Sequence, residues 1–586
     1  MRPFSGALSL ALAGLLSPWG AVVAGGDFNP SYAGIEALHR ALESRQITSK
    51  ELVRYYQCRI ERFNRHGPQI NAVITLNPTA LEDAARLDEA RAVGAHHGLL
   101  YGIPFLAKDN FDTAGVVTSG GSAALKQSVP TVNAFVLQRL LDQGAILVGK
   151  ANMSELAASY GRLGYSSAGG LTLNPYNTAR DVSGSSSGSA AAVAADFATF
   201  ALGTDTSGSI RGPAAVAGLV GLRPTLGLTS RSHVIPLSLT IDTTGVLTHT
   251  VRDLAIVLDT IAARDSDDAS TEYQPEHRGS YLAAFDSGAL KHARLGVIRN
   301  FRGANAEVDG VEQTALRVLT TQGAIVLPVT LPKEFEQLWD LVLGPVGEAE
   351  FKPQFERYLR SLPAGPPRTL AQLIDISASD PVANSATPVN PDRLRALKLA
   401  NDTQLTDSPT YIHILTELIP SIRRQLETLM RTQHLTALVF STMPCPATPR
   451  FDQPDPTYRC RSDDPQVELH RCLGGVPRGD RAGGPGVGQS AGRILVHGFA
   501  LQRSTTASLR KRVRGCHCSF AAAAASLNPA LRWPRLVAVV GTKGSLSQPS
   551  AGDLRRHGTG IFPLTPRVAG EFLLISKRDS GLVPRG

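Results

Sequence analysis

Seven serines and three threonines lie between Asp181 and Ala214, among glycines and alanines. Runs of glycine and serine are often flexible linkers, but this run has an alanine-rich apolar centre, which linkers seldom have. A serine hydroxyl becomes a useful nucleophile when a base removes its proton. Glycines let backbone N–H groups approach a developing oxyanion. The stretch therefore predicts a buried catalytic site that needs hydroxyl groups and bare backbone together.

The candidate base is Lys108, which follows the apolar run GIPFLA. No histidine-based triad is evident near the serines. A lysine can act as a base only if burial lowers its pKa enough to leave it neutral, and the apolar run would supply that desolvation. A second serine can relay the proton where the lysine does not reach the nucleophile. A lysine after a strand is more often just a solvated charge, so the prediction depends on what accompanies it.

Three patterns in this order resemble the amidase signature family. They are GIPFLAKDNFDTAG around Lys108, SGSSSGSAAA around Ser185 and GTDTSGSIRGPA around Ser209, and the resemblance runs from about Ala33 to Cys460. It implies that Ser209 is the nucleophile, that Ser185 is a bridging serine held by a cis peptide bond, and that Lys108 is the general base. It also implies an α/β fold with a mixed central β-sheet covered by α-helices on both faces.

The resemblance assigns further roles around the nucleophile. Backbone N–H groups of Thr206, Ser207 and Gly208, with that of Ser209, match the family's oxyanion hole. The matching supporting polar positions are Asp205, Arg211 and Ser186.

The chain departs from the family at three glycine positions, which Ser183, Ser187 and Ser207 occupy. Serine at a position that needs a positive φ costs energy. If position 207 is one of these, the geometry of the oxyanion hole suffers.

A competing interpretation makes Ser186 the nucleophile, because Gly184 to Gly188 also fits the G-x-S-x-G elbow of other hydrolases. That elbow needs an apolar strand directly before it, and the preceding NPYNTARDV does not read as a strand. The family resemblance is therefore the stronger prediction.

The elements that must position these residues alternate between strands and helices. Two helices are expected within 33–64, the second with capping-box spacing between Thr48 and Glu51. Strands are expected before Lys108 and after the helix that starts near Asn133, an alternation typical of layered α/β folds. Residues 266–434 mix helices with proline-rich loops, carry no motif, and are expected to form a variable, substrate-facing region.

The N-terminal residues 1–24 read as a secretory signal peptide, with Arg2 before an apolar run and a Val22-Val23-Ala24 cleavage site. The alternatives are a buried helix or a membrane anchor. No later segment has enough apolar length to span a bilayer. We therefore expect a secreted or periplasmic protein without a stable membrane span.

The net charge of +9 comes from the end of the chain. Residues 466–586 carry 18 Lys and Arg against 5 Asp and Glu, whereas the rest carries 41 against 45. The main body therefore gives no reason to expect nucleic-acid binding. Six cysteines are too few for a disulfide scaffold, and a Cys445–Cys460 pair stays open. The short Cys516-His517-Cys518 cluster is weak support for a metal site, and the family resemblance implies no cofactor.

Residues 25–465 are predicted to form the amidase signature domain, and residues 466–586 an aberrant basic tail that is frameshifted or disordered. The family's closing block is missing from this tail. Codons permitted for residues 470–484, read one base later, spell IAASVGFPEVTVPVG, which resembles that block. This is consistent with a frameshift near codons 463–468, and a natural basic extension is the alternative. Loss of the block should leave an unpaired sheet edge.

The sequence thus predicts a secreted amidase that hydrolyses a carboxylic acid amide through an acyl-enzyme. Its expected partners are a small-molecule or peptide amide and at most a second copy, as a monomer or homodimer. The alternatives are a catalytically impaired amidase-fold protein that acts as a binding module, and an amidotransferase subunit.

Overall fold

The structure is a computed structural model that describes residues 28–94, 98–272, 274, 279–300, 302, 305–458 and 460, with the backbone of 493–497 and 539–541. The expected signal peptide and most of the expected tail lie outside the described residues. No helix among the described residues is long and apolar enough to cross a membrane.

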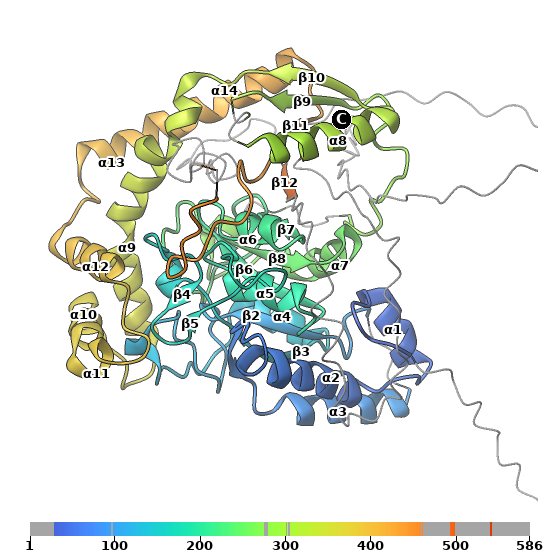
Figure 1. Ribbon diagram of the computed structural model, residues 1–586, viewed down its shortest axis with the longest axis vertical. Coiled ribbons are helices and arrows are strands. Elements are labelled where there is room, and N and C mark those ends of the chain that lie inside the picture. The colour runs from blue at the N-terminus through green and yellow to red at the C-terminus, as the bar shows by residue number, and fades with distance from the viewer. Residues whose placement is uncertain are drawn as a thin grey trace, which may run out of the picture.

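A mixed sheet forms the centre of the molecule, in the strand order β1-β3-β2-β6-β8-β7-β12-β13 (Figure 1). β2 pairs in parallel with β3 and β6, and the remaining pairs are antiparallel. This confirms the predicted mixed sheet. Its strands are β1 Val73–Leu76, β2 Pro104–Lys108, β3 Ile146–Ala151, β6 Phe200–Asp205, β7 Val220–Leu222, β8 Thr243–Thr248, β12 Arg493–His497 and β13 Val539–Gly541.

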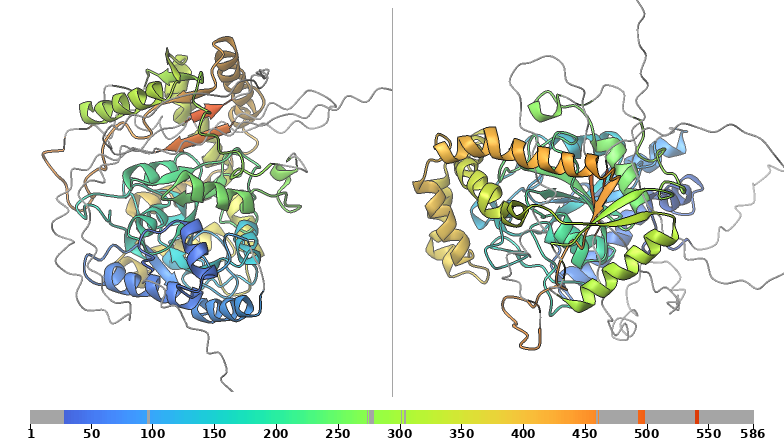
Figure 2. Two further views of the ribbon diagram at one scale, coloured as in Figure 1. Left: turned by 90° about the vertical axis from the view of Figure 1, so that its right-hand side faces the viewer. Right: turned by 90° about the horizontal axis from the view of Figure 1, so that it is seen from above.

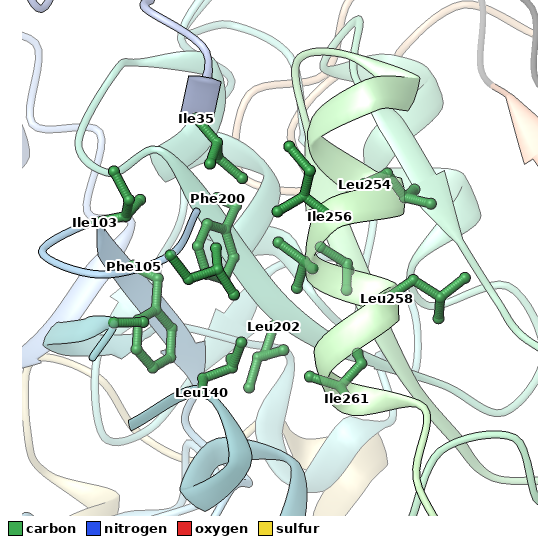
Figure 3. Packing of buried hydrophobic residues seen from close by; sticks show 14 of the residues in the cluster. Ile35, Ile103, Phe105, Leu140, Phe200, Leu202, Leu254, Ile256, Leu258 and Ile261 are labelled. Carbon is green, nitrogen blue, oxygen red and sulfur yellow. The ribbon is translucent and has the colours of Figure 1, made fainter. Parts of the chain in front are cut away.

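Different helices cover the two faces of this sheet, because side chains alternate along each strand. On β2, Phe105 packs into a cluster with α1, α4 and α7, whereas Leu106 packs with α5 on the other face. On β6, Phe200 packs into the same cluster as Phe105, and Ala201 packs into the same cluster as Leu106. Figure 3 shows Phe105 and Phe200 beside Leu140 and the apolar side of α7. The layers are therefore α/β/α, as predicted.

The helices around the central sheet have apolar faces and recognisable starts. Thr48 and Glu51 form the predicted capping box at the start of the second helix. The helix and strand expected after Asn133 are both present. These helices are α1 Ile35–Glu43, α2 Ser49–Ile60, α3 Ala80–Ala92, α4 Phe135–Asp142, α5 Ser187–Ala194, α6 Arg211–Val216 and α7 Val251–Ile261.

The region without motifs contains a second, smaller parallel sheet that the sequence analysis did not predict. It has the order β10-β9-β11, and α8 and α14 pack on its opposite faces (Figure 2). α9 runs along the side of the molecule toward α10–α12 (Figure 1). The elements of this region are β9 Arg294–Ile298, α8 Ala306–Thr321, β10 Ile325–Val329, α9 Gly344–Ser361, α10 Leu370–Ala378, α11 Asp380–Ala383, α12 Pro391–Asp402, α13 Pro409–His413 and α14 Ile419–Thr432, and β11 Ala437–Val439 follows directly after it.

One edge of the central sheet differs from the expectation that it would be unpaired. β12, which comes from the basic tail, pairs antiparallel with β7, with Val496 opposite Gly221 and His497 opposite Val220. An edge strand offers free N–H and C=O groups to any extended segment, and the apolar run RILVH is such a segment.

Candidate active site

Lys108, Ser185 and Thr204 meet at the end of β2. Lys108 is fully buried, and its Nζ lies 2.7 Å from Ser185 Oγ. The same Nζ lies 2.7 Å from Thr204 Oγ1 and 3.4 Å from the Thr204 carbonyl oxygen. The structure thus brings together the predicted base and the predicted bridging serine.

Burial lowers the pKa of Lys108 to about 7, although the carboxylates of Asp205 and Asp242 act in the opposite direction. A substantial fraction of this lysine is therefore neutral near pH 7. A neutral amine has two N–H donors and one lone pair. The two oxygen atoms of Thr204 can accept the donors, which leaves the lone pair for the Ser185 hydroxyl.

Thr204 is a site residue that the sequence analysis missed. Its hydroxyl also accepts a hydrogen bond from Asn110 Nδ2 at 3.0 Å, so Thr204 Oγ1 holds both Asn110 and Lys108. The only local signal was a threonine in the strand FALGTD, where the four residues before it are apolar or glycine.

The two serine-bearing loops lie against each other. Ser186 N–H donates to the Ser209 carbonyl oxygen at 3.1 Å, and the peptide bond between Gly184 and Ser185 is cis, as the resemblance implies. Ser185 is buried whereas Ser209 is partly exposed. Of the two serines, Ser209 is thus the one that a substrate can reach.

The surroundings of Ser186 are those of a buried structural residue. It is fully buried at the start of α5, and its hydroxyl donates to the Thr204 carbonyl oxygen at 3.1 Å. A nucleophile elbow requires an exposed hydroxyl, so the competing assignment of Ser186 as the nucleophile has no support here.

Asp205 organises the loop that carries Ser209. Its carboxylate accepts hydrogen bonds from Gly208 N–H at 2.7 Å and Ile210 N–H at 3.0 Å, and it forms ion pairs with Arg211 and Arg223. Burial alone would raise the pKa of Asp205, but the two guanidinium groups hold it well below its usual range. Asp205 and Arg211 therefore occupy the predicted supporting positions, and Arg223 is a partner that the sequence analysis missed.

The predicted oxyanion hole needs one correction. Gly208 adopts φ +130°, which favours glycine, but its N–H is already bound to Asp205. Gly208 therefore supplies the shape of the loop rather than a free donor. Within the described residues, the N–H groups of Thr206, Ser207 and Ser209 have no hydrogen-bond acceptor, so these three are the candidate oxyanion donors.

The departures from glycine have unequal consequences. Ser207 is not among the described residues with positive φ, and Ser187 begins α5. Ser183 is the exception, with φ +60°, a conformation that costs a residue with a Cβ energy.

A loop closed by a disulfide packs against Asp181, at the start of the segment that carries Ser183 and Ser185. Cys445 and Cys460 form a disulfide, which settles the pairing that the sequence left open. Within the loop, the Thr448 carbonyl oxygen accepts a hydrogen bond from Asp181 N–H at 2.9 Å. Asp181 Oδ1 in turn accepts from Ser183 N–H at 2.7 Å. The loop thus holds the residues that lead to Ser185 and Ser186.

The described residues contain no group of three or more side chains arranged to hold a metal ion. The Cys516-His517-Cys518 cluster lies outside those residues.

Comparisons with known proteins identify the family and the fold. A family model described as Amidase matches residues 51–471. The native peptide amidase from Stenotrophomonas maltophilia has a similar structure, with 35% identity and a TM-score of 0.68, over 75% of this chain and 88% of that one. An amidase family protein from Bacillus anthracis is 31% identical with a TM-score of 0.63, over 70% and 80% of the two chains.

Curated relatives match over a shorter length. A glutamyl-tRNA(Gln) amidotransferase subunit from Caldanaerobacter subterraneus is 39% identical over 303 residues, which are 51% of this chain and 60% of that protein. A putative amidase from Schizosaccharomyces pombe is 38% identical over 335 residues, 54% and 57% of the two proteins. The chain thus spans less than two thirds of the length of these relatives.

Proposed function

Because the chain belongs to the amidase family, we propose that it hydrolyses the C–N bond of a carboxylic acid amide through Ser209, Ser185 and Lys108. The observation that carries this proposal is the contact of 2.7 Å between the buried Lys108 Nζ and Ser185 Oγ. The activity, the substrate and the roles of the three residues are all part of the proposal.

In the proposed acylation step, Ser209 Oγ attacks the carbonyl carbon and forms a C–O bond. Its proton passes to Ser185, whose own proton passes to the lone pair of Lys108. The resulting oxyanion accepts hydrogen bonds from the N–H groups of Thr206, Ser207 and Ser209. When the oxyanion collapses, the C–N bond breaks and the leaving amine takes a proton back through Ser185. Water then hydrolyses the acyl-enzyme by the same relay.

Two substitutions and a serine-reactive fluorophosphonate probe test this mechanism. Ser209→Ala should abolish labelling and amide hydrolysis, and Lys108→Ala should lower kcat by at least about 100-fold, as expected for loss of a general base. Ser189→Ala is the matched control, because the Ser189 hydroxyl is buried on α5 and donates only to the Leu202 carbonyl oxygen. Labelling of the Ser209→Ala variant, or full activity of Lys108→Ala, would refute the mechanism.

The names of several curated relatives support a second candidate, an amidotransferase subunit that acts on charged tRNA. The predicted signal peptide and the acidic main body count against it. Ammonia release from glutamine, compared with release from a panel of peptide amides and simple amides, separates the two functions. If the protein hydrolyses no amide and the probe does not label it, a non-catalytic binding module is the better assignment.

We also propose that the protein is exported, on the basis of the N-terminal residues 1–24. The measurement is mass spectrometry of the N-terminus of the protein recovered outside the cytoplasm. A mature chain that starts after about Ala24 supports export, and an intact N-terminus on a cytoplasmic protein contradicts it.

A further inference from the structure

A second buried carboxylate lies close to the proposed active site. Asp242 borders a small cavity together with Thr204 and Thr206. Thr206 Oγ1 donates to Asp242 Oδ1 at 2.5 Å, and Thr206 begins the stretch of candidate oxyanion donors. Burial raises the pKa of Asp242 above its usual value, but hydrogen bonds from its neighbours favour the ionised form.

Asp242 ends an irregular segment, residues 237–242, and directly precedes the inner strand β8. The N–H groups of Leu237 and Ser238 donate to Asp242 Oδ2 at 2.8 and 2.9 Å. These bonds close the segment on itself. Contacts with other parts of the molecule add to them, because Arg223 donates to the Ile241 carbonyl oxygen at 2.6 Å and Arg231 donates to the Leu239 carbonyl oxygen.

The helix α9, in the region without motifs, makes two further contacts with this segment, one through Gln354 and one through Glu350. Glu350 is buried, with 2% of its surface exposed. Its carboxylate accepts from Ser238 Oγ at 2.7 Å, from Thr240 N–H at 3.1 Å and from the Thr240 hydroxyl. Tyr411 on α13 donates to the same carboxylate at 2.7 Å.

A carboxylate suits this position better than its amide. All four hydrogen-bonding groups around Glu350 act as donors, and an ionised carboxylate is an acceptor only, with capacity for about four hydrogen bonds. A glutamine would turn an NH₂ group toward some of these donors. The described residues provide no ion pair for Glu350 within 4.0 Å. The four donors therefore have to offset the cost of its burial.

From these contacts we propose that Glu350 is a positioning residue for the active site, which holds Asp242 and, through it, Thr206 beside the catalytic residues. The connection runs from α9 through Ser238 and Asp242 to the loop that carries Ser209. This inference rests on the proposed function, because it assigns a role in that same reaction.

Glu350→Gln is the test, and Glu348→Gln is the matched control, since Glu348 is an exposed glutamate on the same helix. With a primary amide that the wild-type protein hydrolyses, Glu350→Gln should lower kcat about tenfold with less than a threefold change in KM, because the oxyanion donors act on the transition state. The control should match the wild type. Tyr411→Phe removes one donor and should lower kcat in the same direction, which keeps the test valid if Glu350→Gln does not fold.

The pH profile distinguishes positioning from general destabilisation. Asp205 and Asp242 are the carboxylates that raise the pKa of Lys108. Asp205 is fixed by its arginine partners, so displacement of Asp242 should move the acid limb of kcat/KM to lower pH. Asp242→Asn should cause the same shift, and the Asp242→Asn/Glu350→Gln double variant should lose little more than Asp242→Asn alone.

The outcomes are separable. A wild-type protein without amidase activity or fluorophosphonate labelling overturns the proposed function and this inference with it. An active wild type, with Glu350→Gln and Tyr411→Phe that keep its kcat and pH profile, overturns only the role of Glu350. Fully multiplicative losses in the double variant also overturn that role.

Discussion

Replacement of Thr204 by valine should impair catalysis strongly, although the two side chains have nearly the same shape. Thr204 Oγ1 is the acceptor 2.7 Å from Lys108 Nζ, and it is buried. In the proposed reaction Lys108 becomes positively charged as Ser209 attacks. A hydrogen bond from a charged donor is roughly twice as strong as one from a neutral donor. The Thr204 contact is therefore stronger in the transition state than in the resting enzyme.

The magnitude follows from the burial of this contact. A buried donor that loses its acceptor costs about 1–3 kcal/mol, and each 1.4 kcal/mol is about a factor of ten in rate. Thr204→Val should therefore lower kcat roughly 5- to 150-fold. Since the hydrogen bond favours the charged lysine, its loss should also move the acid limb of the pH profile below the wild-type position.

The assay is steady-state amide hydrolysis between about pH 5 and pH 9, where Lys108 would titrate. Thr244→Val is the control. Thr244 lies directly opposite Thr204 on β8, is also buried, and donates its hydroxyl to the Ser230 carbonyl oxygen. A kcat for Thr204→Val within twofold of the wild type, or an equal loss in Thr244→Val, would show that Thr204 does not hold the base.

Four other outcomes are expected. Wild-type kcat/KM should rise with pH through about 7, because only neutral Lys108 accepts a proton; a flat profile from pH 5 to 9 would contradict that role. Ser183→Gly should raise the free energy of unfolding by about 1 kcal/mol in urea denaturation, because φ +60° no longer opposes a Cβ, and a loss of stability would count against this. Replacing both Cys445 and Cys460 by serine should cost about 3 kcal/mol by the same method, as expected for a loop with a separation of 15 residues, and unchanged stability would show that the disulfide constrains nothing. DNA sequencing across codons 455–520 should reveal GFPEVTVP in the neighbouring frame, and its absence would show that the basic tail is genuine.

Local patterns were sufficient to predict much of the fold. The capping box at Thr48 and the helix α4 that follows Asn133 depend on residues a few positions apart. The parallel strands β9 and β10 were missed because short apolar runs do not distinguish a strand from a buried helix segment. Their pairing, between Arg294–Ile298 and Ile325–Val329, depends on contacts across α8 that no local pattern encodes.

The candidate site was predictable only where its residues form motifs. Lys108, Ser185 and Ser209 sit in patterns that can be compared with a family. Thr204 and Glu350 act through neighbours that are distant in the chain, as the sequence separation of 110 between Thr240 and Glu350 illustrates. Their roles emerge only when the strands and α9 are placed side by side.

The tight packing of α5 has a consequence for engineering. Every residue of this helix is buried, and a Cβ on Gly188 would lie 2.3 Å from the Asn152 carbonyl oxygen. Substitutions that enlarge side chains of this helix should therefore destabilise the protein, typically by about 1–3 kcal/mol each. Substitutions that aim to alter selectivity are therefore better placed in the irregular segment that ends at Asp242 and in the helices that support it.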